Sequence, residues 1–146
     1  MGFLHRTSAL VRRPVTYRDI RLGFAVDALF DRAIRRLVGL EVRCGDGVHR
    51  LLPFPACEVR GESLRVDSPL VLLEGNVDFY RLRGCTFEAL LGTSVALDSR
   101  EAGLLADLLV TGDGEVRRVV VAGEEGPLEL DPAAAVLGDR DLRPAV

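Results

Sequence analysis

Two aspartates embedded in apolar stretches are the residues of this chain best suited to chemistry. Asp27 and Asp107 each have hydrophobic neighbours on both sides. A carboxylate in such a setting can act as a general acid or base, or can bind a metal ion. It is more often held by hydrogen bonds from the backbone beside a turn. We therefore interpret both aspartates as structural, and we predict no catalytic residue and no metal ligand.

The other residue types that carry most enzyme chemistry are scarce. The only histidines are His5 and His49, and all 19 cationic residues are arginines. The absence of lysine excludes Schiff bases, pyridoxal phosphate enzymes and the lysine-dependent phosphate-binding loop. Cys44, Cys57 and Cys85 are odd in number and lack the CxxC spacing of a zinc knuckle or redox site. We predict a protein that is not an enzyme and that binds no cofactor.

Arginine side chains are the best candidates for binding a partner. Residues 1–50 carry ten arginines against five acidic residues, whereas residues 84–146 carry five arginines against twelve acidic residues. This asymmetry allows the two halves to dock, within one chain or between copies, and allows the basic half to hold an anion. Guanidinium groups bind phosphates and carboxylates alike. The predicted partner-binding residues are Arg12, Arg13, Arg35 and Arg36.

Short strands and tight turns must position these side chains. Hydrophobic and polar residues alternate from Val38 to Cys44, which predicts a strand with one buried face. Gly45-Asp46-Gly47 then predicts a hairpin turn, and Pro53 should end the return strand. Gly112-Asp113-Gly114 predicts a second hairpin of the same kind. Further strands are predicted over residues 63–67, 104–111, 115–122 and 128–130.

Helices are predicted to be few and short. Thr86 can cap a helical turn over residues 87–90, which should stop at Gly92. Asp131 followed by Pro132 predicts the start of a second helix, over residues 133–137. Short strands joined by glycine-rich turns are typical of small all-β barrels. The predicted fold class is therefore all-β with short helical turns.

An internal repeat organises the chain. Gly23-x-x-x-Asp27-x-Leu29 matches Gly103-x-x-x-Asp107-x-Leu109 at an offset of 80. Arg35-Arg36-Leu37-Val38 matches Arg117-Arg118-Val119-Val120 at an offset of 82. We attribute the difference in offset to the intervening hairpin, where insertions are tolerated. The repeat predicts that Asp27 and Asp107 occupy equivalent positions, and that Arg117 and Arg118 affect an anionic partner less than Arg35 and Arg36 do.

The repeated motif carries a family resemblance. In the stretch from Gly23 to Asp31, followed by the stretch from Arg36 to Val42, the chain resembles the PRC-barrel family. This small β-barrel is shared by the photosynthetic reaction-centre H subunit and the ribosome maturation factor. The second half looks similar again, from Gly103 to Val110 and over Val119-Val120-Val121. The resemblance implies two small PRC-type β-barrels in tandem: a first domain at residues 1–68, a linker at 69–83 and a second domain at 84–146.

The resemblance also implies a binding or assembly module. We therefore expect an adaptor that binds a protein partner. Arginine in place of every lysine, with abundant Ala, Gly, Val and Leu, suggests a bacterial source. We expect a cytoplasmic location, because there is no secretory signal and no apolar run of membrane-spanning length. One alternative is an RNA or ribosome-assembly factor that uses the basic first barrel. Another is a peripheral cytoplasmic subunit of a membrane complex of the photosynthetic type. A homo-oligomer is compatible with each of these.

Overall fold

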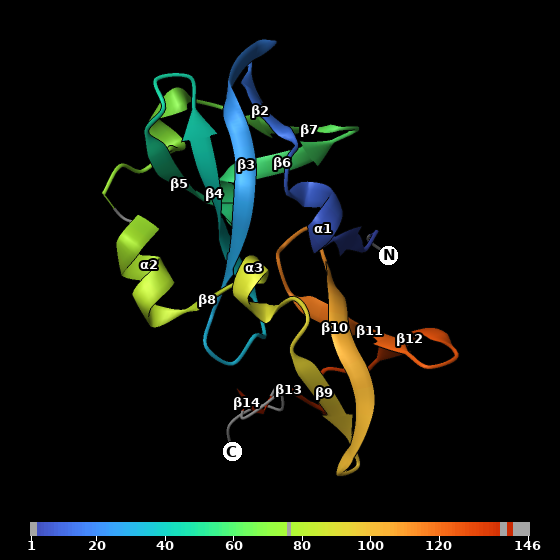
Figure 1. The fold of residues 1–146 in the computed structure, drawn as a ribbon. Helices are drawn as coiled ribbons and strands as arrows, with labels where there is room; N and C mark the ends of the chain where they lie inside the picture. Colours follow the sequence, from blue (N-terminus) through green and yellow to red (C-terminus); the bar gives the residue numbers. More distant parts are fainter. Residues whose placement is uncertain (1–2, 76, 138–139, 142–146) are drawn as a thin grey trace.

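The chain folds mainly into β-strands that form two sheets, and one of the sheets curls into a half-barrel. The computed structural model describes residues 3–75, 77–137 and 140–141. Figure 1 shows the two sheets as two lobes, one above the other, with the long strands β3 (Ile20–Phe30) and β10 (Arg100–Val110) running through them. This confirms the predicted all-β class at the level of two sheets with short helices.

The first lobe contains the sheet that is built mainly from residues 14–66. In the described part of the chain its strands follow the order β5-β4-β3-β2-β7-β6, and β8 also pairs with β3. The hairpin partners are antiparallel, whereas β2 and β7 run parallel. The remaining bounds are β2 Pro14–Tyr17, β4 Leu37–Cys44, β5 His49–Pro53, β6 Cys57–Arg60, β7 Ser63–Val66 and β8 Cys85–Thr86.

The second lobe repeats the arrangement with the same number of strands. Its described strands follow the order β12-β11-β10-β9-β13-β14, and β1 also pairs with β10. Here the closing strand β13 runs antiparallel to β9, unlike the parallel pair in the first lobe. The bounds are β1 His5–Arg6, β9 Ser94–Leu97, β11 Val116–Gly123, β12 Gly126–Leu130, β13 Ala135–Leu137 and β14 Arg140–Asp141.

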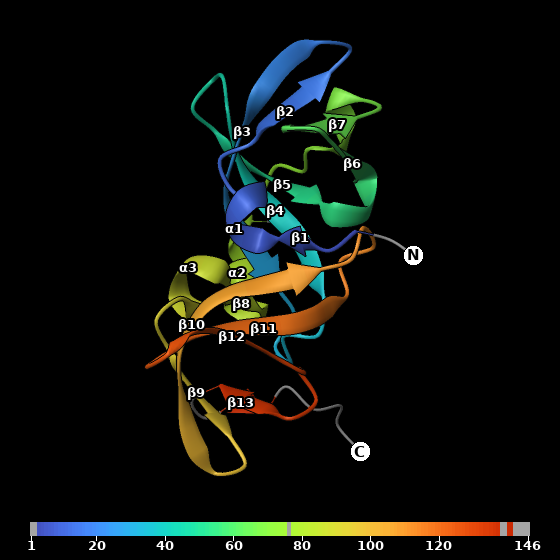
Figure 2. The same ribbon diagram turned by 90° about the vertical axis from the view of Figure 1, so that its right-hand side faces the viewer.

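Three short α-helices and two 3-10 turns complete the described structure. The helices are α1 (Thr7–Leu10), α2 (Val77–Arg83) and α3 (Phe87–Leu90), and the 3-10 turns are η1 (Phe54–Ala56) and η2 (Pro69–Val71). The Thr86 hydroxyl accepts a hydrogen bond from the Ala89 amide, as predicted for the cap of α3. Figure 2 shows α1 and α3 together at the junction of the lobes.

The predicted hairpins are confirmed. Strand β4 ends at Cys44, Gly47 has a positive φ of 82°, and β5 ends at Pro53.

The prediction of a second helix is wrong. Asp131 does accept a hydrogen bond from the Ala133 amide, but the turn stops there and the chain continues as strand β13. Pairing of β13 with β9 outweighs the local preference for a helix, because it buries Ala135 and Leu137.

The repeat is present in the structure, with a corrected register. Asp27 and Asp107 occupy equivalent positions in two strands of 11 residues each. The larger offset assigned to the next strand is wrong, because Phe30 pairs with Leu37 while Val110 pairs with Val116. Leu37 and Val116 are therefore the equivalent residues. The hairpin before β11 is shorter than the hairpin before β4, so the offset decreases at this point.

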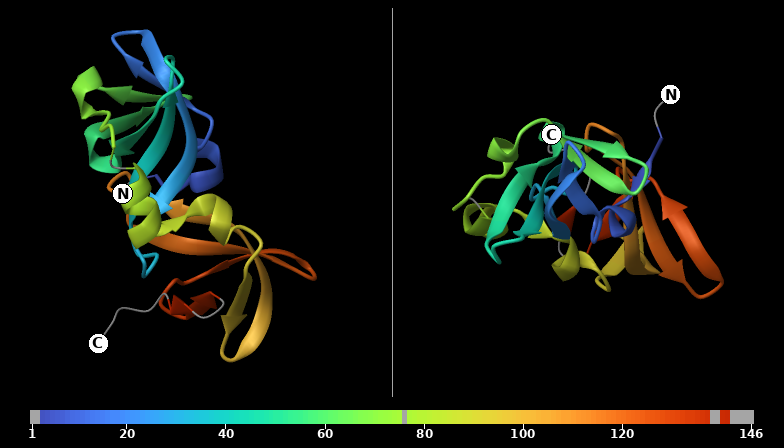
Figure 3. Two further views of the ribbon diagram at one scale, coloured as in Figure 1. Left: turned by 60° about the vertical axis from the view of Figure 1, so that its left-hand side comes forward. Right: turned by 90° about the horizontal axis from the view of Figure 1, so that it is seen from above.

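The two lobes exchange their first strands. Strand β1 precedes the first lobe in sequence but pairs with β10, and β8 precedes the second lobe but pairs with β3. Figure 3 shows the two lobes in close contact where these exchanged strands lie. The hydrophobic core is accordingly continuous between the lobes: it includes Leu40 and Phe54 from the first, and Leu108 and Val119 from the second.

The two repeated aspartates hold the helices at the junction, as their structural interpretation predicts. One carboxylate oxygen of Asp27 accepts hydrogen bonds from the amides of Ala28 (2.8 Å) and Glu88 (3.1 Å), the latter in α3. One oxygen of Asp107 accepts hydrogen bonds from the amides of Leu108 (2.9 Å) and Ser8 (3.1 Å), the latter in α1. Each aspartate thus joins its own strand to a helix at the junction.

Helix α2 packs on the outer face of the first sheet. Its Val77 contacts buried Leu29 and Leu51. Glu41, on β4, is 1% exposed. One of its carboxylate oxygens forms an ion pair with Arg81 of α2, and the other contacts Nδ1 of His49 on β5. A buried carboxylate needs such partners, because an unpaired charge away from water is costly. His49 therefore has a structural role here.

Candidate functional site

The site is built where the hairpin loops of the two long strands meet. The Leu37 amide donates a hydrogen bond to the Gly114 carbonyl (2.7 Å), and the Val116 amide donates one to the Arg35 carbonyl (2.9 Å). The two hydrogen bonds are equivalent under the repeat. They join the β3–β4 loop to the β10–β11 loop, so residues far apart in sequence are held side by side.

Each loop is closed by a side chain at its start. Asp31 accepts a hydrogen bond from the Arg35 amide (2.7 Å), and Thr111 accepts one from the Glu115 amide (3.1 Å). Gly114 has a φ of 93°, and a Cβ atom there would lie 2.6 Å from the Leu37 carbonyl oxygen. Glycine is therefore required where the loops touch.

A polar groove of about 650 Å³ lies across these joined loops. Four arginines line it: Arg35 and Arg36 from the first loop, and Arg117 and Arg118 from the start of β11. All four are exposed. Its acidic lining residues are Asp31, Glu115 and Asp131.

The three acidic side chains at the groove all have partners. The Asp31 and Asp131 carboxylates accept hydrogen bonds from backbone amides of their own turns. Glu115 forms an ion pair with Arg117, with a nitrogen–oxygen distance of 3.1 Å. Within the described residues, no carboxylate lies within ion-pair distance of the other three arginines of the groove. With four arginines against three carboxylates, the lining keeps a net positive charge.

This arrangement can bind a carboxylate or a phosphate. The Arg36 guanidinium donates to the Asp113 carbonyl (2.8 Å), and that of Arg118 donates to the Arg117 carbonyl (2.8 Å). Each contact uses one N–H of a group that has five, so donors remain for an anion. Planar guanidinium groups bind such oxyanions with two parallel hydrogen bonds.

The four predicted binding residues lie in different places. Arg35 and Arg36 line the groove. Arg13 instead donates to the carbonyls of Ala9 (2.8 Å) and Gly61 (2.8 Å), which ties the start of β2 to the β6–β7 turn. Arg12 lines a separate, more apolar groove beside β3 and α3.

Arg117 and Arg118 belong to the same groove as Arg35 and Arg36, which the sequence did not indicate. The repeat alignment set the two pairs at equivalent positions in different settings. In the corrected register, Arg117 is equivalent to Val38 and Arg118 to Gly39. The expectation that the second pair affects an anionic partner less therefore loses its basis. The available signal was the Arg-Arg pair in each half, which does not by itself say that the two pairs meet.

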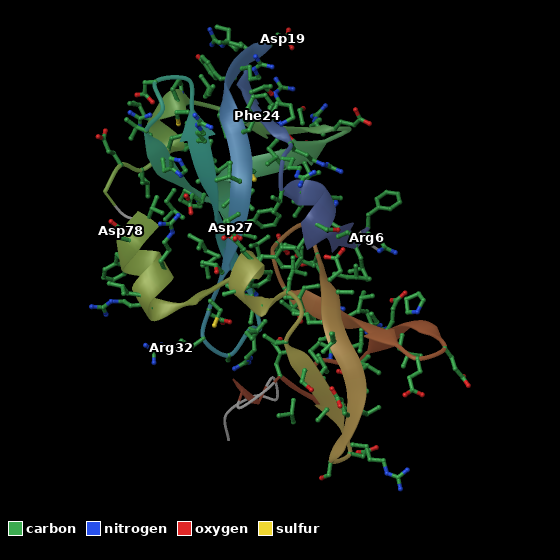
Figure 4. All side chains as sticks on the ribbon, in the orientation of Figure 1. Arg6, Asp19, Phe24, Asp27, Arg32 and Asp78 are labelled. Atoms are coloured by element: carbon green, nitrogen blue, oxygen red, sulfur yellow. The ribbon has the colours of Figure 1, made fainter. Side chains whose placement is uncertain are left out.

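The pKa of the Asp27 carboxyl group is shifted by its surroundings. Burial raises the pKa of its carboxyl group, and the nearby Glu88 and Glu41 carboxylates add to this effect. Figure 4 shows Asp27 on β3, close to α3. The folded state therefore binds more protons at Asp27 than the unfolded chain does, so this residue makes the protein less stable as the pH rises above about 4.

We expect Asp27→Asn to change this pH dependence. The carbonyl oxygen of the substituted amide keeps both backbone hydrogen bonds, whereas the charge is removed. The free energy of unfolding of the variant, relative to that of the unmodified protein, should therefore increase as the pH rises from 4 to 7. Urea unfolding across this range measures the difference. A difference that is constant with pH would contradict the prediction.

Comparisons with known proteins leave the family undecided. No family model matches the chain, and a search of curated proteins gives no match. Within the described residues, no helix is long and apolar enough to cross a membrane.

Proposed function

We propose that the chain is a tandem PRC-barrel protein that works as a non-enzymatic, cytoplasmic adaptor. In this proposal an acidic segment of a partner protein binds in the arginine-lined groove. The motif resemblance in both halves supports the family, and the repeated strand arrangement is consistent with it. No cofactor is required.

The observation that carries the proposal is the convergence of two arginine pairs from distant parts of the chain. Arg35-Arg36 and Arg117-Arg118 line one groove, although the chain as a whole has a net charge of −3. Backbone hydrogen bonds between the loops hold the pairs in place. A preorganised cationic groove binds an anion at a lower entropic cost than flexible surface arginines do.

Replacing either arginine pair with alanine should weaken partner binding. We expect Arg35→Ala/Arg36→Ala and Arg117→Ala/Arg118→Ala each to raise the Kd about tenfold or more, because each removes charge-assisted hydrogen bonds. Capture of the partner from native lysate, followed by titration of the purified partner at several salt concentrations, measures the effect. The salt dependence should become weaker in both variants.

A matched variant separates groove binding from overall charge. Arg60→Ala/Arg83→Ala removes the same charge from exposed positions outside the groove, and it should bind the partner as the unmodified protein does. All three variants should lose little stability, since exposed ion pairs contribute about 0–1 kcal/mol. Equal binding by all the proteins would show that the groove is not the partner site.

The same experiment distinguishes the alternatives. If the unmodified protein retains ribosomal RNA with a steep salt dependence, the chain is a ribosome-assembly factor. If it co-purifies with membranes and is released by salt, the chain is a peripheral subunit of a membrane complex.

A further inference from the structure

The repeat allows the two ends of the molecule to be compared position by position. The β2–β3 hairpin projects from the first lobe and the β9–β10 hairpin projects from the second, at opposite ends of the molecule (Figure 1). Asp19 marks the tip of the first hairpin in Figure 4. Under the repeat, Arg18 corresponds to Asp98 and Arg21 to Glu101, and both turns contain residues with positive φ. The two ends therefore share a turn conformation, and their net charges are opposite in sign: residues 18–21, which include Asp19, carry +1, and residues 98–101, which include Arg100, carry −1.

The first end presents apolar side chains among unpaired arginines. Ile20 is 59% exposed and Phe24 is 40% exposed. Phe24 pairs with Arg43 across the β3–β4 ladder, and the Arg21 guanidinium lies 4.7 Å from the centre of the Phe24 ring. Within the described residues, none of the arginines of this face has a carboxylate partner. We call this surface the basic face: Arg18, Ile20, Arg21, Phe24 and Arg43.

The second lobe presents the complementary surface. A groove of about 540 Å³ lies between β10, β11 and β12, and its lining includes Glu101, Glu124 and Glu125. Leu128, which also lines the groove, is 46% exposed. We call this surface the acidic groove. Its glutamates form no ion pair within the described residues.

We propose that the basic face of one copy docks in the acidic groove of a second copy. Apolar side chains at the centre of each surface and opposite charges around them match the composition of a protein interface. The two surfaces differ, so the contact is head-to-tail and leaves one free surface at each end of a dimer. Further copies can then add, which forms open linear assemblies.

A nucleic acid or a lipid surface bound to the basic face would explain fewer of these features than a second copy does. The guanidinium of Arg21 already covers one side of the Phe24 ring, and that of Arg18 lies 5.2 Å from the centre of the Tyr17 ring. These rings therefore have less open surface for stacking nucleic-acid bases. A lipid surface would account for the arginines and leave the acidic groove without a role. A second copy uses both surfaces.

Sedimentation equilibrium over a range of protein and salt concentrations tests the proposal. At low salt the average mass should rise above 15.9 kDa with increasing concentration, and added salt should return it to the monomer. We expect Arg18→Glu/Arg21→Glu and Glu124→Arg/Glu125→Arg each to weaken self-association about 100-fold, because each places like charges together.

Mixing the two variants provides the decisive control. The acidic groove of the first variant and the basic face of the second are both intact, so the mixture should associate where each variant alone does not. Arg60→Glu, outside both surfaces, should assemble as the unmodified protein does. A monomeric unmodified protein at low salt, or no association in the mixture, would overturn the proposal. So would single-stranded RNA or anionic vesicles binding to the basic face of a protein that stays monomeric.

Discussion

Replacing Gly103 with alanine is expected to unfold the protein or to lower its free energy of unfolding by more than about 3 kcal/mol. Gly103 has a φ of 143°, which L-residues rarely adopt. A Cβ atom there would lie 2.3 Å from the Ala122 carbonyl oxygen and 2.9 Å from the Ala122 carbonyl carbon. These are backbone atoms of the neighbouring strand, so the sheet itself would have to open.

Urea unfolding followed by circular dichroism measures this effect. Gly23→Ala should behave similarly, because its Cβ would lie 2.3 Å from the Arg43 carbonyl oxygen in the equivalent part of the first sheet. Gly112→Ala is the matched control. No heavy atom lies within 4 Å of its Cβ position, so its stability should change by no more than about 0.5 kcal/mol. Equal stability of Gly103→Ala and Gly112→Ala would show that the close approach of β10 and β11 is not required.

Phe30→Ala is expected to destabilise both lobes by about 3–5 kcal/mol. The Phe30 side chain is fully buried and packs against Phe87, with ring centres 6.5 Å apart. Its backbone pairs with Cys85 in β8, the strand that the second half contributes to the first sheet. Removing the ring therefore leaves a cavity at the junction of the lobes.

Hydrogen exchange with urea unfolding checks this prediction. Amide protection should fall in β10 as well as in β3, because the core is continuous between the lobes. Phe79→Ala removes a ring that is 48% exposed on α2, and it should cost less than about 1 kcal/mol. If Phe30→Ala lowers protection only in the first lobe, the lobes unfold independently and the shared core is not a cooperative unit.

Much of the local structure could be predicted from the residues alone. Alternation of hydrophobic and polar residues predicted β4, and the glycine-containing turns predicted its hairpin and the equivalent hairpin before β11. The internal repeat predicted that Asp27 and Asp107 are equivalent. These predictions succeed because strand periodicity and turn conformation depend on neighbouring residues.

Only the packing of the sheets shows which residues that are distant in the chain come into contact. Strand β13 replaced a predicted helix because it pairs with β9, which lies well before it in the chain. The two-residue strands β1 and β8 form only by pairing with the opposite lobe, and strands this short have no periodicity to detect. Arg117 and Arg118 join Arg35 and Arg36 because backbone hydrogen bonds link two loops far apart in the chain. Such contacts depend on how the sheets pack, and local sequence patterns do not determine them.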